Sequence, residues 1–187
     1  MRRRLTGEDF DELYASDPDP WGFETREYEQ AKYAATTEAL QGHRFRSALE
    51  VGCSIGVLTA RLAEHCDTLL AVDAAQAAVD RARARLAGSS NVVVERRELP
   101  EDFPEGPFEL IVCSEVLYYL DPPAFDAMLD AIARELTGSL LAVHWRHGTS
   151  SYPLLGDEVH ERLEGRFGTA AYSELTPDYA LDRFDVT

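Results

Sequence analysis

Short apolar runs alternate with longer amphipathic stretches through most of the chain. Five runs rich in Val, Leu and Ile predict strands over residues 47–51, 68–72, 91–95, 108–114 and 139–145. Between them, apolar positions recur with a helical period and predict helices over residues 57–65, 75–86 and 124–136. Asp121, followed by two prolines, is a typical N-cap and first turn for the last helix. This alternation is typical of βαβ units that build a parallel sheet.

The two ends of the chain follow different patterns. Residues 25–40 predict an amphipathic helix, which follows the Pro-rich turn at residues 17–21. Near the other end, residues 168–175 and 179–186 are strand-like runs separated by a short polar turn. No helical pattern lies between these two runs, so they predict an antiparallel hairpin.

Length and composition fit one folded domain. A chain of 187 residues can bury a substantial core, and apolar and charged shares of 45% and 28% are those of an ordinary globular protein. Five parallel strands finished by a hairpin predict an α/β fold with a Rossmann-like, doubly wound, seven-stranded mixed sheet. We expect a single domain over residues 1–187, with residues 1–42 as an N-terminal helical lid and residues 43–187 as its core.

Charge and cysteine content narrow the range of partners. The formal net charge of -16 repels polyphosphate, so we expect a small-molecule partner and no nucleic acid. Cys53, Cys66 and Cys113 form no paired framework and indicate a reducing, cytoplasmic location. Polar residues follow Arg2–Arg4, and no segment reaches the roughly 18 apolar residues of a membrane span, so we expect neither export nor a membrane partner. Nothing in these patterns predicts an oligomeric state.

Residues 49–58 form a strand that turns through small residues into a helix. Glycines there let a ligand approach the backbone, and the helix N-terminus offers N–H groups, so the turn predicts a nucleotide-type ligand. A dinucleotide fingerprint would place glycines at positions 52, 54 and 57, and only the first is present. The pattern acidic-x-G-x-G-x-G is matched at Glu50, Gly52 and Gly56, with Ser54 as a small replacement for the middle glycine.

An acidic residue follows this turn at a suitable distance. Asp73 stands twenty-one residues past Gly52, at the end of the second predicted strand. A carboxylate at that point can accept hydrogen bonds from ribose hydroxyls. The turn by itself is often simple turn chemistry, but turn and acid together favour a cofactor that contains a nucleoside.

Three segments of the sequence together resemble the class I S-adenosylmethionine-dependent methyltransferases: residues 49–56, 71–73 and 108–120. More narrowly, the chain resembles the nodulation-protein-S type, which methylates an amino group on a sugar. Members of that type also begin with a segment like residues 17–23, followed by helix residues such as Tyr28 and Tyr33. The resemblance covers nearly the whole chain from Asp17 onward.

The resemblance implies S-adenosyl-L-methionine as the cofactor and assigns residues to its parts. Glu50, Gly52 and Gly56 would hold the methionine part, and Asp73 the ribose. Six more residues are expected around the cofactor, besides Glu98 and Leu99 at the adenine rim: Trp21, Tyr28, Cys53, Ser54, Ala74 and Ser114. The two aromatic residues in that set would lid the cofactor or contact its sulfonium through cation–π interaction, with ordinary packing of an amphipathic helix as the alternative.

The ends of the fourth and fifth predicted strands carry the candidate catalytic residues. Glu115 directly follows a buried run, where ligands bind in open sheets, and is expected to orient the acceptor and take its proton. The alternative for Glu115 is a helix-capping or salt-bridge carboxylate. His144, at the end of the fifth strand, is the second candidate, although lone histidines are usually structural or face solvent.

Four residues are candidates for the acceptor site: Tyr33, Tyr118, Tyr119 and His147. Aromatic faces suit sugar or apolar rings, although one of the adjacent pair Tyr118 and Tyr119 is expected to point into the core. No metal ion is expected, because Asp157 and His160, about one helical turn apart, match no tight ligand motif.

The preferred function is transfer of a methyl group to an amine of a small molecule, with an amino sugar as one such acceptor. Methylation of a hydroxyl on a sugar or another small acceptor stays open. A third possibility is a cofactor-binding module that has lost catalysis, against which the presence of Glu50, Asp73 and Glu115 argues.

Overall fold

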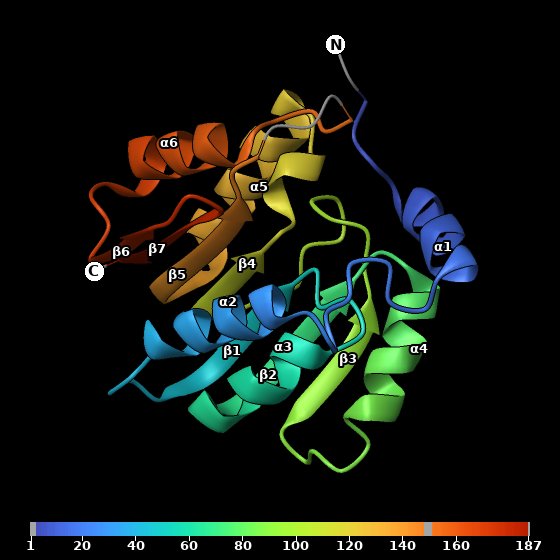
Figure 1. The fold of residues 1–187 in the computed structure, drawn as a ribbon. Helices are drawn as coiled ribbons and strands as arrows, with labels where there is room; N and C mark the ends of the chain where they lie inside the picture. Colours follow the sequence, from blue (N-terminus) through green and yellow to red (C-terminus); the bar gives the residue numbers. More distant parts are fainter. Residues whose placement is uncertain (1–2, 148–150, 187) are drawn as a thin grey trace. The chain divides into compact units, whose positions relative to one another are not determined.

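The computed structural model consists of two compact units. Figure 1 shows its labelled helices and strands. One unit is Thr6–Glu98, and the other joins Leu99 onward to the first residues of the chain. The structure describes residues 3–147 and 151–186. Residues of the expected lid therefore share a unit with the first three strands.

In the first unit, two helices precede three strands that alternate with further helices. The elements are α1 (Gly7–Ser16), α2 (Glu27–Glu38), β1 (Phe45–Val51), α3 (Val57–Leu62), the 3-10 turn η1 (Ala63–His65), β2 (Cys66–Asp73), α4 (Gln76–Arg85) and β3 (Val92–Arg96). The strands are parallel in the order β3-β2-β1, with Leu49 opposite Leu70 and Leu70 opposite Val93. All three therefore end at the same edge of the sheet.

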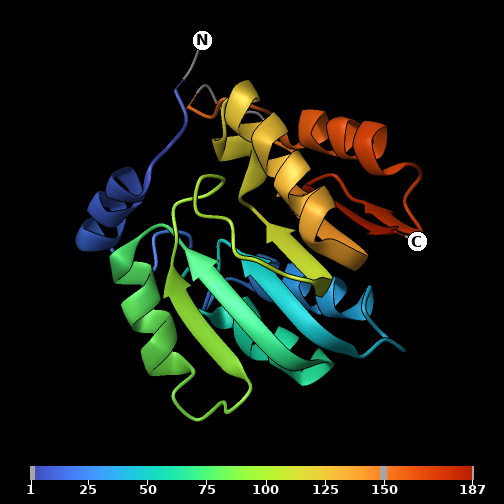
Figure 2. The same cartoon turned by 180° about the vertical axis from the view of Figure 1, so that it is seen from behind.

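The second unit carries the remaining four strands. Its elements are β4 (Phe108–Ser114), the 3-10 turn η2 (Leu117–Tyr119), α5 (Pro122–Glu135), β5 (Leu136–Trp145), α6 (Gly156–Phe167), β6 (Tyr172–Leu175) and β7 (Tyr179–Asp185). Strands β4 and β5 are parallel, and β7 is antiparallel to both β5 and β6. Helices α5 and α6 lie side by side, since Arg162 lies over the Phe125 ring at 5.5 Å and Arg166 pairs with Asp130 at 3.4 Å; Figure 2 views them from behind.

The predicted fold class is confirmed, because the seven strands belong to a mixed sheet with helices between them. Asp121 caps α5 as predicted, with its Oδ1 accepting a hydrogen bond from the Ala124 N–H at 3.1 Å. The first strand of the hairpin is shorter than predicted and begins at Tyr172, because Gly168, with φ of 85°, ends helix α6 in the region that favours glycine. Helices α1 and α6 were not predicted.

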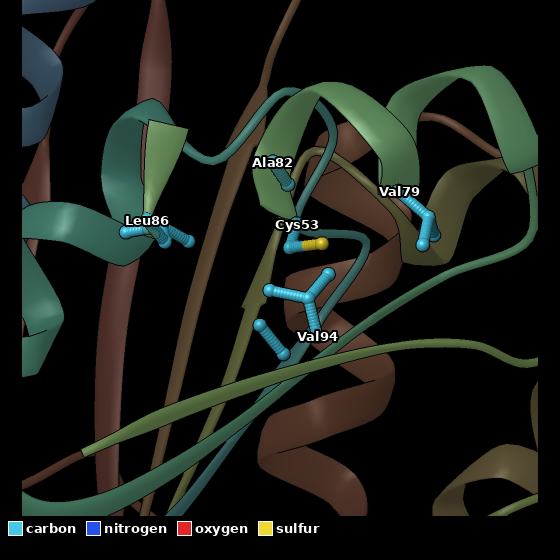
Figure 3. Close-up of a cluster of buried hydrophobic side chains, with 6 residues drawn as sticks. Cys53, Val79, Ala82, Leu86 and Val94 are labelled. Carbon is cyan, nitrogen blue, oxygen red and sulfur yellow. The ribbon is translucent and has the colours of Figure 1, made fainter. Parts of the chain in front are cut away.

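A cluster of buried side chains fixes the loop after β1 against helix α4. Figure 3 shows the Cys53 side chain among Val79, Ala82, Leu86 and Val94, with Ala71 completing the cluster. Gly56 makes the close approach possible, because a Cβ there would lie 3.2 Å from the Ala82 backbone. The loop expected to contact the cofactor therefore packs against the hydrophobic core through Cys53.

Candidate active site

The loop between β1 and α3 passes three times through the left-handed region of backbone conformation. Gly52, Ser54 and Gly56 have φ of 74°, 51° and 79°. Ser54 thus adopts the conformation that glycine favours, as the middle position of the pattern requires. The N–H groups of Gly52 and Cys53 donate to Val72 O at 2.8 and 3.0 Å. These two donors are therefore used inside the protein, where they tie the loop to the end of β2.

Asp73 ties this loop to the loop that follows β2. Its Oδ2 accepts from the Ser54 N–H at 2.8 Å, and its Oδ1 accepts from the Ala75 N–H at 2.9 Å. Burial raises the pKa of Asp73 to about 6, against the opposing effect of these backbone donors. Each carboxylate oxygen has more than one lone pair, so both can still accept from a ribose hydroxyl.

Glu50, near the end of β1, is buried with an unsatisfied oxygen. Its side chain is 2% exposed, and Oε2 has no hydrogen-bond partner among the described residues. Thr59 Oγ1 is buried in the same condition. Burial raises the pKa of Glu50 to about 7; the nearby Thr59 hydroxyl opposes the rise, and repulsion from Asp73 adds to it. A buried carboxylate oxygen without a hydrogen-bond partner suits a cationic or hydrogen-bonding ligand.

Helix α1 covers the loops that follow β1, β2 and β3. The Tyr14 hydroxyl hydrogen-bonds the Ser54 hydroxyl, and Asp11 Oδ1 accepts from the Ala77 N–H at 3.0 Å. The Gly7 N–H donates to the carboxylate of Glu98 at 3.3 Å. A Cβ at Gly7 would lie 2.5 Å from Ala74 O, so the helix begins in close contact with the expected cofactor residues.

Sequence reasoning missed Tyr14 and Asp11 because it missed helix α1. A signal was present, since Thr6 and Asp9 have the spacing of a capping box. The Asp9 carboxylate accepts from both the backbone N–H and the hydroxyl of Thr6, at 2.8 and 2.9 Å.

The aromatic residues expected over the cofactor contact other side chains of the protein. Trp21 stacks on Phe23 with ring centroids 5.5 Å apart and meets the Tyr14 ring edge-on at 5.7 Å. Tyr33 is 5% exposed, and the Arg61 guanidinium lies over its ring at 5.6 Å. Lys32 Nζ lies over the Tyr28 ring, 5.0 Å from the ring centroid. The structure therefore supports packing and cation–π contacts within the protein for these rings.

In the second unit, Glu115 follows β4 in a left-handed conformation with φ of 56°. Its Oε2 accepts from the Tyr118 hydroxyl at 2.5 Å and from the Trp145 N–H at 2.9 Å. A side chain rarely adopts this φ, and such residues cluster at functional sites. The turn η2 that follows has Val116, and not Glu115, as its N-cap. Ser114 lies half-buried beside it, opposite Val143.

Three tyrosines pack together next to Glu115. The Tyr118 and Tyr152 rings stack at 5.0 Å, and Tyr119 meets Tyr118 and Tyr152 edge-on at 4.7 Å each. Tyr118 and Tyr119 are 5% and 9% exposed, so both are buried, where the sequence predicted one. Burial and the neighbouring Glu115 raise the pKa of Tyr118, which therefore stays a hydrogen-bond donor. Tyr152 was missed for want of any local pattern around it.

The two candidate histidines lie in different surroundings. His144 is fully buried, with Nε2 accepting from the Leu117 N–H at 3.2 Å and Nδ1 at 3.2 Å from His160 Nε2. His147 is exposed and pairs with Asp178 at 2.7 Å. His144 is therefore enclosed by protein, whereas His147 lies at the surface.

The remaining expectations concern the adenine rim, metal ions and membranes. Glu98 closes the first unit, and Leu99, half-buried, opens the second. Asp157 forms an ion pair with Arg146 at 2.6 Å, whereas His160 hydrogen-bonds His144 and Asp182. Within residues 3–147 and 151–186, no group of three acidic, Cys or His side chains is placed to hold a metal ion. None of the helices described is long and apolar enough to cross a membrane.

Comparison with known proteins shows one family. The model of the family "Nodulation protein S (NodS)" matches residues 9–143. Nodulation protein S of Rhizobium tropici is 35% identical over 103 residues, which are 54% of this chain and 43% of that protein. Nodulation protein S of Bradyrhizobium diazoefficiens is 37% identical over 103 residues, 54% of this chain and 49% of that protein. The chain thus spans less than half the length of these two relatives.

Two solved structures are similar along most of the chain. A putative methyltransferase from Pseudomonas syringae is 38% identical with a TM-score of 0.76, covering 86% of this chain and 100% of that one. N-methyltransferase NodS from Bradyrhizobium japonicum, in complex with S-adenosyl-L-homocysteine, has a TM-score of 0.83 at 23% identity, covering 97% and 98%. The second likeness concerns the fold.

Proposed function

The chain belongs to the nodulation protein S family, and from this premise we propose that it is an S-adenosylmethionine-dependent methyltransferase acting on an amine of a small molecule. We propose an amino sugar as the acceptor class. The observation that carries the proposal is Glu115, a carboxylate held at the end of β4 by the Tyr118 hydroxyl and the Trp145 N–H.

The residues of the first unit fit the cofactor. The unsatisfied Glu50 Oε2 suits the α-ammonium group of the methionine part, because a buried carboxylate oxygen needs a donor and favours a cationic one. Asp73 would accept from the ribose hydroxyls, and the glycine at position 52 leaves the backbone open to close approach. When bound, S-adenosylmethionine supplies a methyl group on a positively charged sulfur.

Glu115 has two tasks in this proposal. It orients the acceptor by receiving a hydrogen bond from its nitrogen, and it takes the proton that the nitrogen must lose. The Tyr118 hydroxyl and the Trp145 N–H both donate to Oε2 and hold the carboxylate in one geometry. Of the tyrosines next to Glu115, Tyr152 is half-buried and offers aromatic surface of the kind that sugar rings pack against, with Tyr118 and Tyr119 packed behind it.

One observation favours an amine over a hydroxyl as the acceptor. A hydroxyl is a weak nucleophile that gains most from a base such as imidazole. His144, the imidazole next to this site, is buried with both ring nitrogens hydrogen-bonded, which leaves the weaker base Glu115 for the reaction. A neutral amine already has a reactive lone pair, and only its ammonium form must first lose a proton. Positioning by a carboxylate therefore suffices for an amine.

The test combines calorimetry with a methyl-transfer screen. Calorimetry is expected to give micromolar-range binding of S-adenosylmethionine and S-adenosylhomocysteine and no measurable binding of NAD. The screen then compares amino sugars, other small amines, and the matching sugars with hydroxyl in place of amine, with products identified by mass spectrometry. Transfer confined to the hydroxyl series would replace the amine proposal, and cofactor binding without any transfer would favour the non-catalytic module.

A further inference from the structure

A series of hydrogen bonds links three side chains, Asp182, His160 and His144, to the turn after Glu115. His144 on β5 is fully buried, and His160 on α6 is 7% exposed. His144 Nδ1 lies 3.2 Å from His160 Nε2, and His160 Nδ1 lies 2.5 Å from Asp182 Oδ2 on β7. Asp182 pairs with Ala142 and Ala180 pairs with His144 across β5 and β7, so His144 and Asp182 share the face that α6 covers.

The direction of every hydrogen bond in this chain is determined at its two ends. The Leu117 N–H can only donate, so His144 Nε2 must accept and carries no proton. The neutral His144 ring therefore has its proton on Nδ1 and donates to His160 Nε2. His160 in turn has its proton on Nδ1 and donates to Asp182.

Asp182 can end this series of hydrogen bonds because an ionised carboxylate, with one charge shared by its two oxygens, only accepts. Burial would raise its pKa, but hydrogen bonds from His160 and Ser173 outweigh burial and hold the pKa below its ordinary value of 3.8. If His160 carried its proton on Nε2, it would donate to His144 Nδ1, and His144 would carry its own proton on Nε2. That N–H would then face the N–H of Leu117, and two donors cannot form a hydrogen bond.

We propose that His160 and Asp182 are positioning residues for the acceptor site, because they fix the His144 tautomer that holds the turn η2. The turn begins at Leu117, and the next residue, Tyr118, donates its hydroxyl to Glu115 Oε2. The Tyr118 ring also contacts the His144 ring edge-on, with centroids 5.3 Å apart. The proposal rests on the proposed function only where it assigns Glu115 to the acceptor; the tautomers and the turn are independent of it.

The tautomers are tested first, on the whole chain labelled with ¹⁵N. Long-range proton–nitrogen correlation at neutral pH distinguishes a protonated from an unprotonated ring nitrogen. We expect the Nδ1–H tautomer for both His144 and His160, assigned with the His144→Gln and His160→Gln variants. The Nε2–H tautomer at His144 in the wild-type protein would overturn the proposal, whatever the variants do.

The hold on the turn is tested by amide hydrogen exchange at Leu117 and at Trp145, whose N–H donates to Glu115. His160→Leu removes the acceptor for His144 Nδ1–H and is expected to speed exchange at both amides roughly tenfold or more. His160→Gln keeps a side-chain oxygen that can accept and is expected to restore most of the protection. The control is Asp185→Asn, an exposed carboxyl on the same strand, β7, which is expected to change neither amide. Unchanged exchange in His160→Leu would overturn the hold.

The link to activity is a separate measurement. His160→Leu is expected to lower kcat/KM for the acceptor about tenfold or more, to leave the Kd of S-adenosylmethionine unchanged, and to be rescued in part by His160→Gln. Wild-type turnover in His160→Leu, with exchange at Leu117 increased, would refute the role in positioning. Absence of transfer to any amine by the wild-type protein would instead refute the proposed function, and the NMR results would still decide the hydrogen-bond chain.

Discussion

Replacing Glu50 by glutamine is expected to stabilise the cofactor-free protein at alkaline pH while weakening its hold on the cofactor. The buried carboxyl has its pKa raised from 4.5 to about 7, so the folded state resists its ionisation. That difference corresponds to about 3 kcal/mol once the group is ionised in both states. Since the side chain is 2% exposed, solvent screening reduces this value little.

The sign follows from linkage. A carboxyl whose folded pKa exceeds its unfolded pKa favours the folded state fully below pH 4.5, and this advantage is lost as pH rises through about 7. Between pH 5 and pH 8 the wild-type protein should lose about 2–3 kcal/mol of unfolding free energy through this group. Glu50→Gln does not titrate and should lack that loss, and removal of its charge also relieves the repulsion of Asp73, which reduces the pH dependence further.

Urea unfolding at pH 5 and pH 8, followed by circular dichroism, measures this difference. Glu38→Gln, at an exposed position in the same unit, serves as the control and should keep the wild-type pH dependence. Comparing the change with pH, and not the absolute stability, removes any packing effect of the amide. Calorimetry should also show weaker S-adenosylmethionine binding in Glu50→Gln. Equal pH dependence of wild type and Glu50→Gln would refute the argument from burial.

Three further substitutions test the two units separately. Asp73→Ala should weaken S-adenosylmethionine by at least tenfold in calorimetry, because charge-assisted hydrogen bonds are worth about 1.5–3 kcal/mol each; unchanged affinity would remove Asp73 from the site. Glu115→Gln should bind the cofactor normally and lose turnover roughly 10²–10⁴-fold in a methyl-transfer assay, the usual effect of a general base, whereas full turnover would eliminate that role. Tyr14→Phe keeps the ring and loses only the bond to Ser54, so urea unfolding should show a loss of about 1 kcal/mol, and a loss several times larger would mean that the ring itself has moved.

The elements of the sheet were readable from local pattern. A buried parallel strand needs a continuous apolar run, so the strand at residues 108–114 could be predicted with its exact bounds from the local sequence pattern. The same holds for the turn at Gly52 and for Asp73, since both depend on what directly follows a strand. Glu115 was found for the same reason: an acid placed immediately after a buried run stands out within a short window of sequence.

Only the tertiary structure decided which other residues these side chains contact. No local pattern could show that Tyr14 would reach Ser54, because the bond joins residues forty positions apart and depends on how helix α1 packs. The sequence placed His144 only at the end of a strand; the structure buries it and hydrogen-bonds it through His160 on α6 to Asp182 on β7. The sequence by itself determined the strands, the loop and the acids, since these rest on short-range chemistry. Only packing between distant segments decided which of them lie exposed, which lie buried, and which side chain fixes the proton of another.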